Sequence, residues 1–182
     1  MINFDDIKIV ALDCDGVLTD GIFQESSTGT VTKSFYTRDF WAINQLLKND
    51  IIVIIITGSN DTCMESQLER IYGPEIYEFN YEDFQCRRFK DDNLILFKSV
   101  KEKSKVIDDF IFTNSKHDWD NVAYMGDSEN DLEPIKKSAY TGCPCDAIRE
   151  IKDESNFKSD FSGGKGAVYD FVNYILEKKG LK

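Results

Sequence analysis

Apolar residues gather along the chain in short runs that alternate with segments of helical spacing. The first two runs, residues 7–12 and 51–56, are rich in β-branched side chains, and each is followed by a polar residue. Continuous apolar runs of this length are typical of strands that are buried on both faces of a sheet. Further strands are predicted at residues 94–97, 121–125 and 139–142.

Between these strands, apolar positions recur every three or four residues, which indicates amphipathic helices. The alternation of strands and helices favours a single α/β domain over residues 1–182, in which helices flank a parallel sheet on both faces. We expect helices at residues 40–48, with Asp39 as the capping residue, and at residues 61–72, 102–112, 131–137 and 167–178.

Two segments do not follow this alternation. Residues 17–37 contain two short β-prone stretches around the turn sequence SSTG, and this pattern predicts a β-hairpin. Residues 73–93 combine aromatic and charged residues without a clear period, and we treat them as an insertion, either a short hairpin or a loop. The expected architecture is therefore a Rossmann-like sheet with two additions.

The charge balance limits the partners that the chain is expected to bind. Its 182 residues include 33 acidic and 22 basic side chains, which gives a formal charge of −11. Nucleic acids and anionic membranes are bound through clustered lysines and arginines, so neither is an expected partner. The N-terminal residues show no signal-peptide pattern, and the five cysteines do not indicate a disulfide framework. We therefore expect a cytoplasmic protein.

Polar side chains follow three of the predicted strands, where each strand ends. They are Asp13 together with Asp15, then Thr57, then Asp127. Ligands of open parallel sheets bind beyond the carboxyl ends of the strands, so we expect these side chains to share one edge of the sheet. Two neighbouring carboxylates repel each other unless a cation lies between them. Oxygen ligands without histidine favour a hard ion, and magnesium is the usual choice beside a phosphate.

Each of these residues also has an ordinary structural explanation. Aspartates after strands frequently cap helices, Thr57 with Gly58 forms a common type of turn, and acids suit the first turn of a helix. A functional site is favoured because all of them follow predicted buried strands. A magnesium ion there would let a phosphate approach a carboxylate. Thr57 and Gly58 can donate hydrogen bonds to the phosphate oxygens, and a lysine would complete the neutralisation of the phosphate charge.

These segments resemble the motifs of the haloacid dehalogenase superfamily. Residues 13–21, with the sequence DCDGVLTDG, look like its first motif, residues 56–58 like its second, and residues 126–131, GDSEND, like its fourth. The third motif is a lysine that opens a helix. Lys103 occupies the corresponding place, although two other lysines lie nearby. The resemblance covers nearly the whole chain and implies the fold of this superfamily.

The chain is similar in particular to a small branch of the superfamily that lacks a cap domain. Members of this branch hydrolyse 3-deoxy-D-manno-octulosonate 8-phosphate or nonulosonate 9-phosphates, and related domains form the C-terminal part of some sialic-acid-activating enzymes. Three segments carry the similarity: residues 17–21, which lead into a hairpin where larger relatives insert a cap, residues 33–39, KSFYTRD, and the glycine-rich residues 163–167, GGKGA.

The resemblance implies hydrolysis in two steps. Asp13 attacks phosphorus and forms an aspartyl-phosphate, while Asp15 protonates the leaving sugar oxygen and then activates water. Magnesium is held by Asp13, by the backbone carbonyl of Asp15, and by Asp127. The other residues of the implied site are Thr57, Gly58 and Lys103, which bind the phosphoryl group, and Asp131, which binds the metal indirectly or positions Lys103.

The implied substrate is a phosphorylated keto-deoxy sugar acid, but two positions depart from the pattern. Ser59 stands where relatives often have a charged residue that touches the sugar acid, and Tyr169 stands where arginine is usual. A sugar-acid carboxylate needs a cation. The candidates for this cation are Arg38, Arg70 and Lys165.

The resemblance also implies a homotetramer, in which the hairpin contacts neighbouring subunits and helps to close a site without a cap. Three alternatives remain open: a phosphatase of another small phosphomonoester, a non-catalytic oligomerisation module, and a phospho-receiver-like switch. The acidic cluster argues against a scaffold, which has no need of costly like charges. The pair Asp13 and Asp15 argues against a switch, which needs a nucleophile but no second acid.

Overall fold

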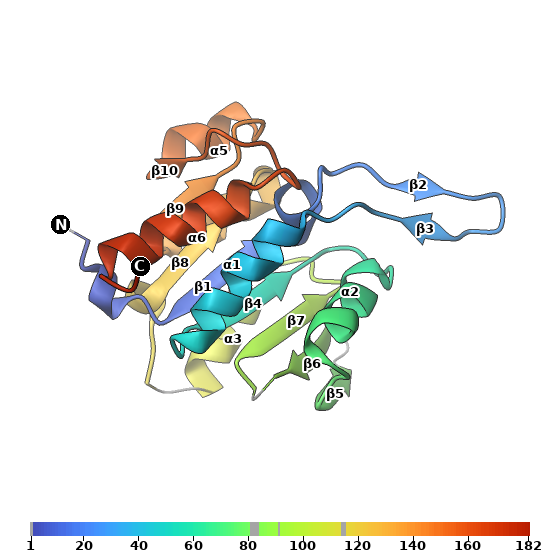
Figure 1. Ribbon diagram of the computed structural model, residues 1–182, viewed down its shortest axis with the longest axis horizontal. Helices are drawn as coiled ribbons and strands as arrows, with labels where there is room; N and C mark the ends of the chain where they lie inside the picture. The colour runs from blue at the N-terminus through green and yellow to red at the C-terminus, as the bar shows by residue number, and fades with distance from the viewer. Residues whose placement is uncertain (1, 81–83, 91, 114–115) are drawn as a thin grey trace.

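The computed structural model describes residues 2–80, 84–90, 92–113 and 116–182. Its centre is one eight-stranded sheet with the order β10-β9-β8-β1-β4-β7-β6-β5 (Figure 1). Six strands of this sheet are parallel: β1 Ile9–Asp13, β4 Ile52–Ile56, β7 Leu94–Lys98, β8 Val122–Met125, β9 Tyr140–Cys143 and β10 Phe157–Lys158. The predicted parallel α/β sheet is confirmed.

Helices cover both faces of the sheet because successive side chains of the central strands point to opposite sides. In β1, Val10 and Leu12 join one apolar cluster, while Ile9 and Ala11 join the other. The first cluster is covered by α1 Thr37–Lys48, α2 Cys63–Tyr72 and α6 Ala167–Lys178, and the second by α3 Lys103–Thr113, α4 Leu132–Lys137 and α5 Arg149–Glu154. No helix in the described part of the chain is long and apolar enough to cross a bilayer.

The two segments that break the alternation both contain hairpins. The first, with β2 Gln24–Glu25 and β3 Val31–Thr32, projects from the body of the molecule (Figure 1). In the insertion, β5 Tyr77–Asn80 and β6 Gln85–Phe89 extend the sheet beyond β7 in antiparallel pairing. Residues 81–83 and 91 of the insertion lie outside the described part of the chain. The sequence reading missed the short elements α5 and β10, which hold too few residues to show a period.

The prediction that Asp39 caps the helix at its own position is wrong. Helix α1 begins at Thr37, so Asp39 lies inside its first turn. Its carboxylate instead accepts a hydrogen bond of 2.8 Å from the backbone N–H of Tyr169, in the first turn of α6. The residue is fully buried, and its Oδ2 has no hydrogen-bond partner among the described residues. Burial raises the pKa of Asp39 to about 7, although the backbone N–H groups of Tyr169 and of Gly166, the residue before α6, oppose this change.

Replacing Asp39 with Asn should therefore change how stability depends on pH. Because the pKa is higher in the folded state, the folded protein holds a proton that the unfolded chain releases near pH 4, and this stabilisation is lost as the pH rises to about 7. Asn keeps an acceptor for the N–H of Tyr169 but carries no charge. As the pH rises from 4 to 8, the free energy of unfolding of D39N should increase relative to that of wild type by on the order of 2–4 kcal/mol.

Urea unfolding from pH 4 to pH 8 measures this difference. The exposed Asp160 provides a matched control, because D160N removes a carboxylate that is not buried. Parallel stability curves for D39N and wild type would show that Asp39 is charged throughout this range.

Candidate active site

The topology brings the predicted residues to one edge of the sheet. Strand β1 lies between β4 and β8, with Asp13 opposite Ile56 and Leu12 opposite Met125. Asp13 ends β1, Thr57 follows β4, and Asp127 follows β8 after one glycine. Because the three strands are parallel, their carboxyl ends meet at the same edge. Lys103 is the first residue of α3 and reaches this edge from the loop after β7.

Lys103 forms the buried centre of the site. Its ammonium contacts the carboxylate of Asp13 and lies 2.7 Å from Asp131 Oδ1. The side chains of all three residues are nearly inaccessible to solvent, with at most 5% exposed. Burial alone would lower the pKa of Lys103, but the two carboxylates raise it well above its usual value. Lys103 is therefore a fixed positive charge beside the oxygen atoms of Asp13.

Asp131 holds Lys103 in place. Its Oδ1 also accepts a hydrogen bond of 2.6 Å from the hydroxyl of Tyr124, and its Oδ2 accepts bonds of 3.0 and 3.1 Å from the backbone N–H groups of Asp127 and Ser128. With four donors already bound, Asp131 has little capacity left for a metal ion. Of the two roles considered for Asp131, the contacts favour the positioning of Lys103.

Asp127 presents an oxygen that lacks a hydrogen-bond donor. Its Oδ1 is buried and has no partner among the described residues. Ligand atoms of Asp13, Asp127 and Asp131 lie within 4.8 Å of one another. Burial raises the pKa of Asp13 well above its usual value, and burial together with Asp131 raises that of Asp127 to about 6. A buried carboxylate oxygen without a donor is costly, and Asp127 together with Asp13 offers oxygen ligands that suit a hard divalent cation.

Gly16 makes the approach of Asp127 possible. A Cβ at this position would lie 2.2 Å from Asp127 Oδ2, and the φ angle of +96° is itself one that only glycine adopts readily. The glycine-rich loop is packed in the same way, because a Cβ on Gly163 would lie 1.9 Å from the carbonyl oxygen of Gly16. These glycines let three backbone segments meet beside Asp13.

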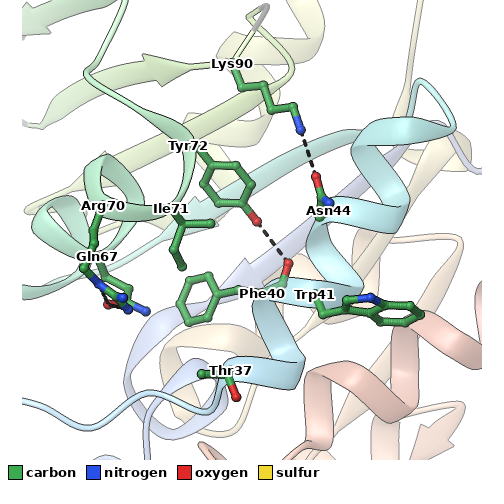
Figure 2. A pocket seen from close by; sticks show the side chains of 9 residues that line it. All are labelled: Thr37, Phe40, Trp41, Asn44, Gln67, Arg70, Ile71, Tyr72 and Lys90. Atoms are coloured by element: carbon green, nitrogen blue, oxygen red, sulfur yellow. Dashed lines mark hydrogen bonds between the residues drawn. The ribbon is translucent and has the colours of Figure 1, made fainter.

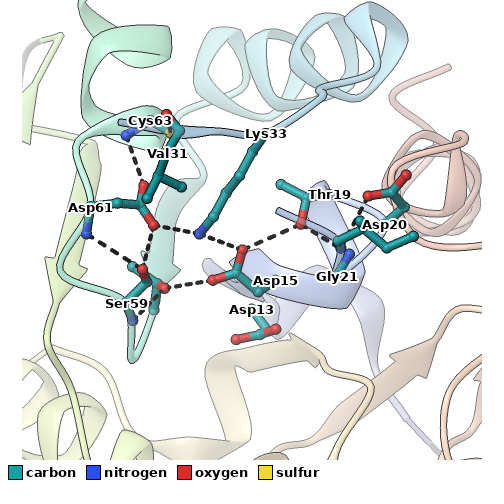
Figure 3. Close-up of polar contacts among 12 residues, drawn as sticks. Asp13, Asp15, Thr19, Asp20, Gly21, Val31, Lys33, Ser59, Asp61 and Cys63 are labelled. Carbon is teal, nitrogen blue, oxygen red and sulfur yellow. Dashed lines mark hydrogen bonds and ion pairs between the residues drawn. The ribbon is translucent and has the colours of Figure 1, made fainter. Parts of the chain in front are cut away.

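The carboxylate of Asp15 lies among polar side chains that include Lys33 and Thr19 (Figure 3). It accepts hydrogen bonds from the hydroxyls of Thr57, at 3.2 Å, and Thr19, at 3.3 Å. The ammonium of Lys33 lies 2.7 Å from Asp15 and 2.6 Å from Asp61. The sequence reading did not assign Lys33 or Asp61 to the site. Lys33 begins the run KSFYTRD, and this resemblance was the one signal available for it.

The other predicted binding residues are less close to the cluster. Gly58 is exposed at the edge of the sheet, and Arg38 is exposed in the first turn of α1. The side chain of Lys165 is 61% exposed and lies 3.8 Å from Asp20. Arg70 belongs to a separate cavity of about 570 Å³ between α1 and α2, which contains none of the predicted catalytic residues (Figure 2). Arg38, Arg70 and Lys165 have no ion pair or hydrogen bond with Asp13, Asp15 or Asp127.

Magnesium should stabilise the protein more strongly at pH 8 than at pH 5. Below about pH 6 protons compete for Asp127, whereas above it the ion meets a charged ligand. Metal at 100 times its Kd would add about 2.7 kcal/mol to the free energy of unfolding. Thermal unfolding with magnesium or a chelator, at both pH values, measures the effect. D127N should lose the stabilisation by magnesium, and the control D160N should keep it. If magnesium raised the unfolding temperature of D127N as much as that of wild type, the ion would bind elsewhere.

Comparison with known proteins gives relatives that share most of this chain. No family model matches it. The 3-deoxy-D-manno-octulosonate 8-phosphate phosphatase KdsC of Escherichia coli strain B is 27% identical over 180 residues, which cover 99% of this chain and 85% of that protein. The N-acylneuraminate cytidylyltransferase B of Danio rerio is 25% identical over 173 residues, which cover 95% of this chain but 37% of that protein.

Solved structures of such phosphatases share the fold. The cobalt-bound enzyme from Haemophilus influenzae is 26% identical, with a TM-score of 0.80 over 98% of this chain and 92% of that one. The enzyme from Moraxella catarrhalis, in complex with magnesium, phosphate and KDO, is 22% identical, with a TM-score of 0.81 over 98% and 91% of the two chains. The chain is thus a homologue of the KdsC phosphatases, which are hydrolases of the haloacid dehalogenase superfamily.

Proposed function

We propose that this protein is a magnesium-dependent phosphatase that hydrolyses the phosphomonoester of a keto-deoxy sugar acid. The substrate is 3-deoxy-D-manno-octulosonate 8-phosphate or a nonulosonate 9-phosphate. The observation that carries the proposal is the buried group of Asp13, Lys103 and Asp127. It combines a carboxylate nucleophile, a fixed positive charge and an oxygen without a donor at a point where three strands end.

In the first step, a carboxylate oxygen of Asp13 forms a bond to phosphorus while the bond from phosphorus to the sugar oxygen breaks. Asp15 gives its proton to that oxygen, so the sugar leaves as an alcohol. Lys103 and the Thr57 hydroxyl bind oxygens of the phosphoryl group as their charge is redistributed. A magnesium ion held by Asp13, Asp127 and the Asp15 carbonyl would neutralise charge and allow the phosphate dianion to approach.

In the second step, water attacks the phosphorus of the aspartyl-phosphate. Asp15, now a carboxylate, takes a proton from the water, and the bond between phosphorus and Asp13 breaks to release phosphate. Asp15 is suited to both proton transfers because its side chain is 34% exposed, whereas that of Asp13 is 5% exposed. Each turnover thus returns both carboxylates to their starting state.

The choice of a sugar acid is supported by the relatives rather than by a cation in this chain. The E. coli relative is named for 3-deoxy-D-manno-octulosonate 8-phosphate, and the M. catarrhalis structure contains KDO and phosphate. A cation for the substrate carboxylate would come from Arg38 or Lys165, whose side chains are exposed. We also propose that residues 1–182 act as one domain in a homotetramer. Exposed Ile22 and Phe23, at 66% and 59%, favour a partner for the hairpin.

Phosphate release from a panel of phosphomonoesters tests this function. The panel contains p-nitrophenyl phosphate, the two sugar-acid phosphates, a hexose 6-phosphate and a nucleoside monophosphate, each with magnesium or with a chelator. The kcat/KM for one sugar-acid phosphate should exceed that for the hexose phosphate by about 100-fold or more. Equal rates would reject the substrate, and a complete lack of release would favour the oligomerisation module.

A further inference from the structure

Lys33 lies at the base of the hairpin, between two carboxylates (Figure 3). Its Nζ is 2.7 Å from Asp15 Oδ1 and 2.6 Å from Asp61 Oδ2. Only 5% of the side chain is exposed, although Lys33 follows β3, whose two residues are not buried. Surface ion pairs keep most of their hydration and contribute little. A lysine that is removed from water and shared by two acids has a more specific role.

Lys33 is the strongest restraint on the Asp15 carboxylate. The hydroxyls of Thr19 and Thr57 donate to it over 3.3 and 3.2 Å, which is longer than the usual distance of about 2.7–2.8 Å between hydroxyl and acceptor oxygens. The contact from Lys33 is short and charged, and such contacts are about twice as strong as neutral ones. Because a third of the Asp15 side chain is exposed, packing does not fix its direction.

Lys33 is in turn held by Asp61 at the start of α2. Asp61 accepts hydrogen bonds from the hydroxyl of Ser59 and, at 2.9 Å, from the backbone N–H of Cys63. Cys63 Sγ also donates to the carbonyl of Val31 over 3.4 Å, so a second contact joins the hairpin base to α2. The ammonium of Lys33 therefore has a second anchor besides Asp15, at the start of α2.

A cavity of about 370 Å³ opens beside this pair. It is lined by Asp15, Lys33 and Asp61, and by the apolar side chains of Phe23 and Val31. With Asp15 protonated, as the first step requires, the ammonium of Lys33 and the carboxylate of Asp61 cancel, so the cavity has no net positive charge to attract a second anion. The neutral part of a leaving group fits this cavity better, and the Asp15 carboxylate lies on its wall.

We propose that Lys33 is a positioning residue that directs Asp15 toward the oxygen of the leaving group, and that Asp61 holds Lys33 in place. This inference rests on the proposed function, in which Asp15 protonates that oxygen as its bond to phosphorus breaks. During phosphorylation of Asp13, the effect of Lys33 should therefore appear only with a leaving group that needs a proton.

Phosphorylation of Asp13 in a single turnover tests this role with two leaving groups. The alkoxide of a sugar phosphate must be protonated as it leaves, whereas p-nitrophenolate leaves without a proton. With the best sugar phosphate of the panel as donor, K33M should phosphorylate Asp13 about 10- to 100-fold more slowly than wild type. This loss is smaller than the full contribution of an acid catalyst, because Asp15 itself is still present. The KM of K33M should stay within a factor of about three, because the ground-state contacts of the phosphate do not involve Lys33. The rate with p-nitrophenyl phosphate should change much less.

Three further variants separate positioning from folding. K33R keeps the charge and should restore most of the rate, and K48M removes an exposed lysine at the end of α1 as a control. D61N should slow the same step in the wild-type background but add nothing in the K33M background, because Asp61 acts through Lys33. Equal losses with both leaving groups, or independent effects of K33M and D61N, would overturn the inference.

Crystal structures of wild type and K33M test the same point without turnover. Asp15 should occupy one position in wild type and a different one in K33M, while Lys103 still contacts Asp13 and Asp131. An unmoved Asp15 carboxylate would reject the role of Lys33 even in an active enzyme. A wild-type protein that releases no phosphate would reject the proposed function, and the two failures remain distinguishable.

Discussion

Replacement of Asp13 by Asn should abolish turnover while the fold is retained. Loss of the nucleophile leaves no group to form the aspartyl-phosphate, and we expect kcat to fall by about 1,000-fold or more. Asn can still accept a hydrogen bond from Lys103, and it removes a carboxylate whose pKa is raised by burial. The free energy of unfolding without metal should therefore stay equal to that of wild type or rise.

Magnesium-dependent phosphate release and urea unfolding measure the two quantities in D13N. Mass spectrometry after a rapid acid quench should find the phosphoryl group on wild type and not on D13N. The exposed Asp160 again supplies the control, since D160N should keep both activity and labelling. A D13N variant with wild-type activity would remove Asp13 from the mechanism and leave the metal site without an assigned nucleophile.

Replacement of Lys103 by Met should affect both activity and stability. The change leaves the buried carboxylates of Asp13 and Asp131 without their shared cation. Breaking a buried pair in this way costs about 3–5 kcal/mol, because an uncompensated charge remains. Activity should fall by about 100-fold or more, since the charge that stabilises the phosphoryl group is lost. Magnesium should recover a part of the stability by supplying another cation near Asp13.

Urea unfolding with and without magnesium, together with steady-state kinetics, measures these effects. Lys101 provides the matched control, because it lies just before α3 but is exposed. K101M should retain activity and stability. A loss in K101M comparable to that in K103M would mean that Lys101 serves as the lysine of the third motif, and a change in K103M below about 1 kcal/mol would contradict the burial argument.

The sequence alone determined the architecture and the chemistry at the ends of the strands. Buried parallel strands require uninterrupted apolar runs, so the polar residues that interrupt them are visible without coordinates. This reasoning found Asp13, Thr57 and Asp127, and the resemblance added Lys103. Short elements such as α5 and β10 were not predicted because they lack a period, and for the same reason the hairpin of β5 and β6 was only one of two alternatives for residues 73–93.

Only the tertiary structure decided which side chains act together. Asp39 stabilises the first turn of α6 rather than its own helix, and Asp131 binds Lys103 rather than standing free for a metal. Lys33 and Asp61 meet Asp15 because the hairpin and α2 pack at one edge. Periodicity reports the burial of each residue along its own strand or helix. Contacts between side chains from distant segments depend on how those elements pack, and no local pattern encodes them.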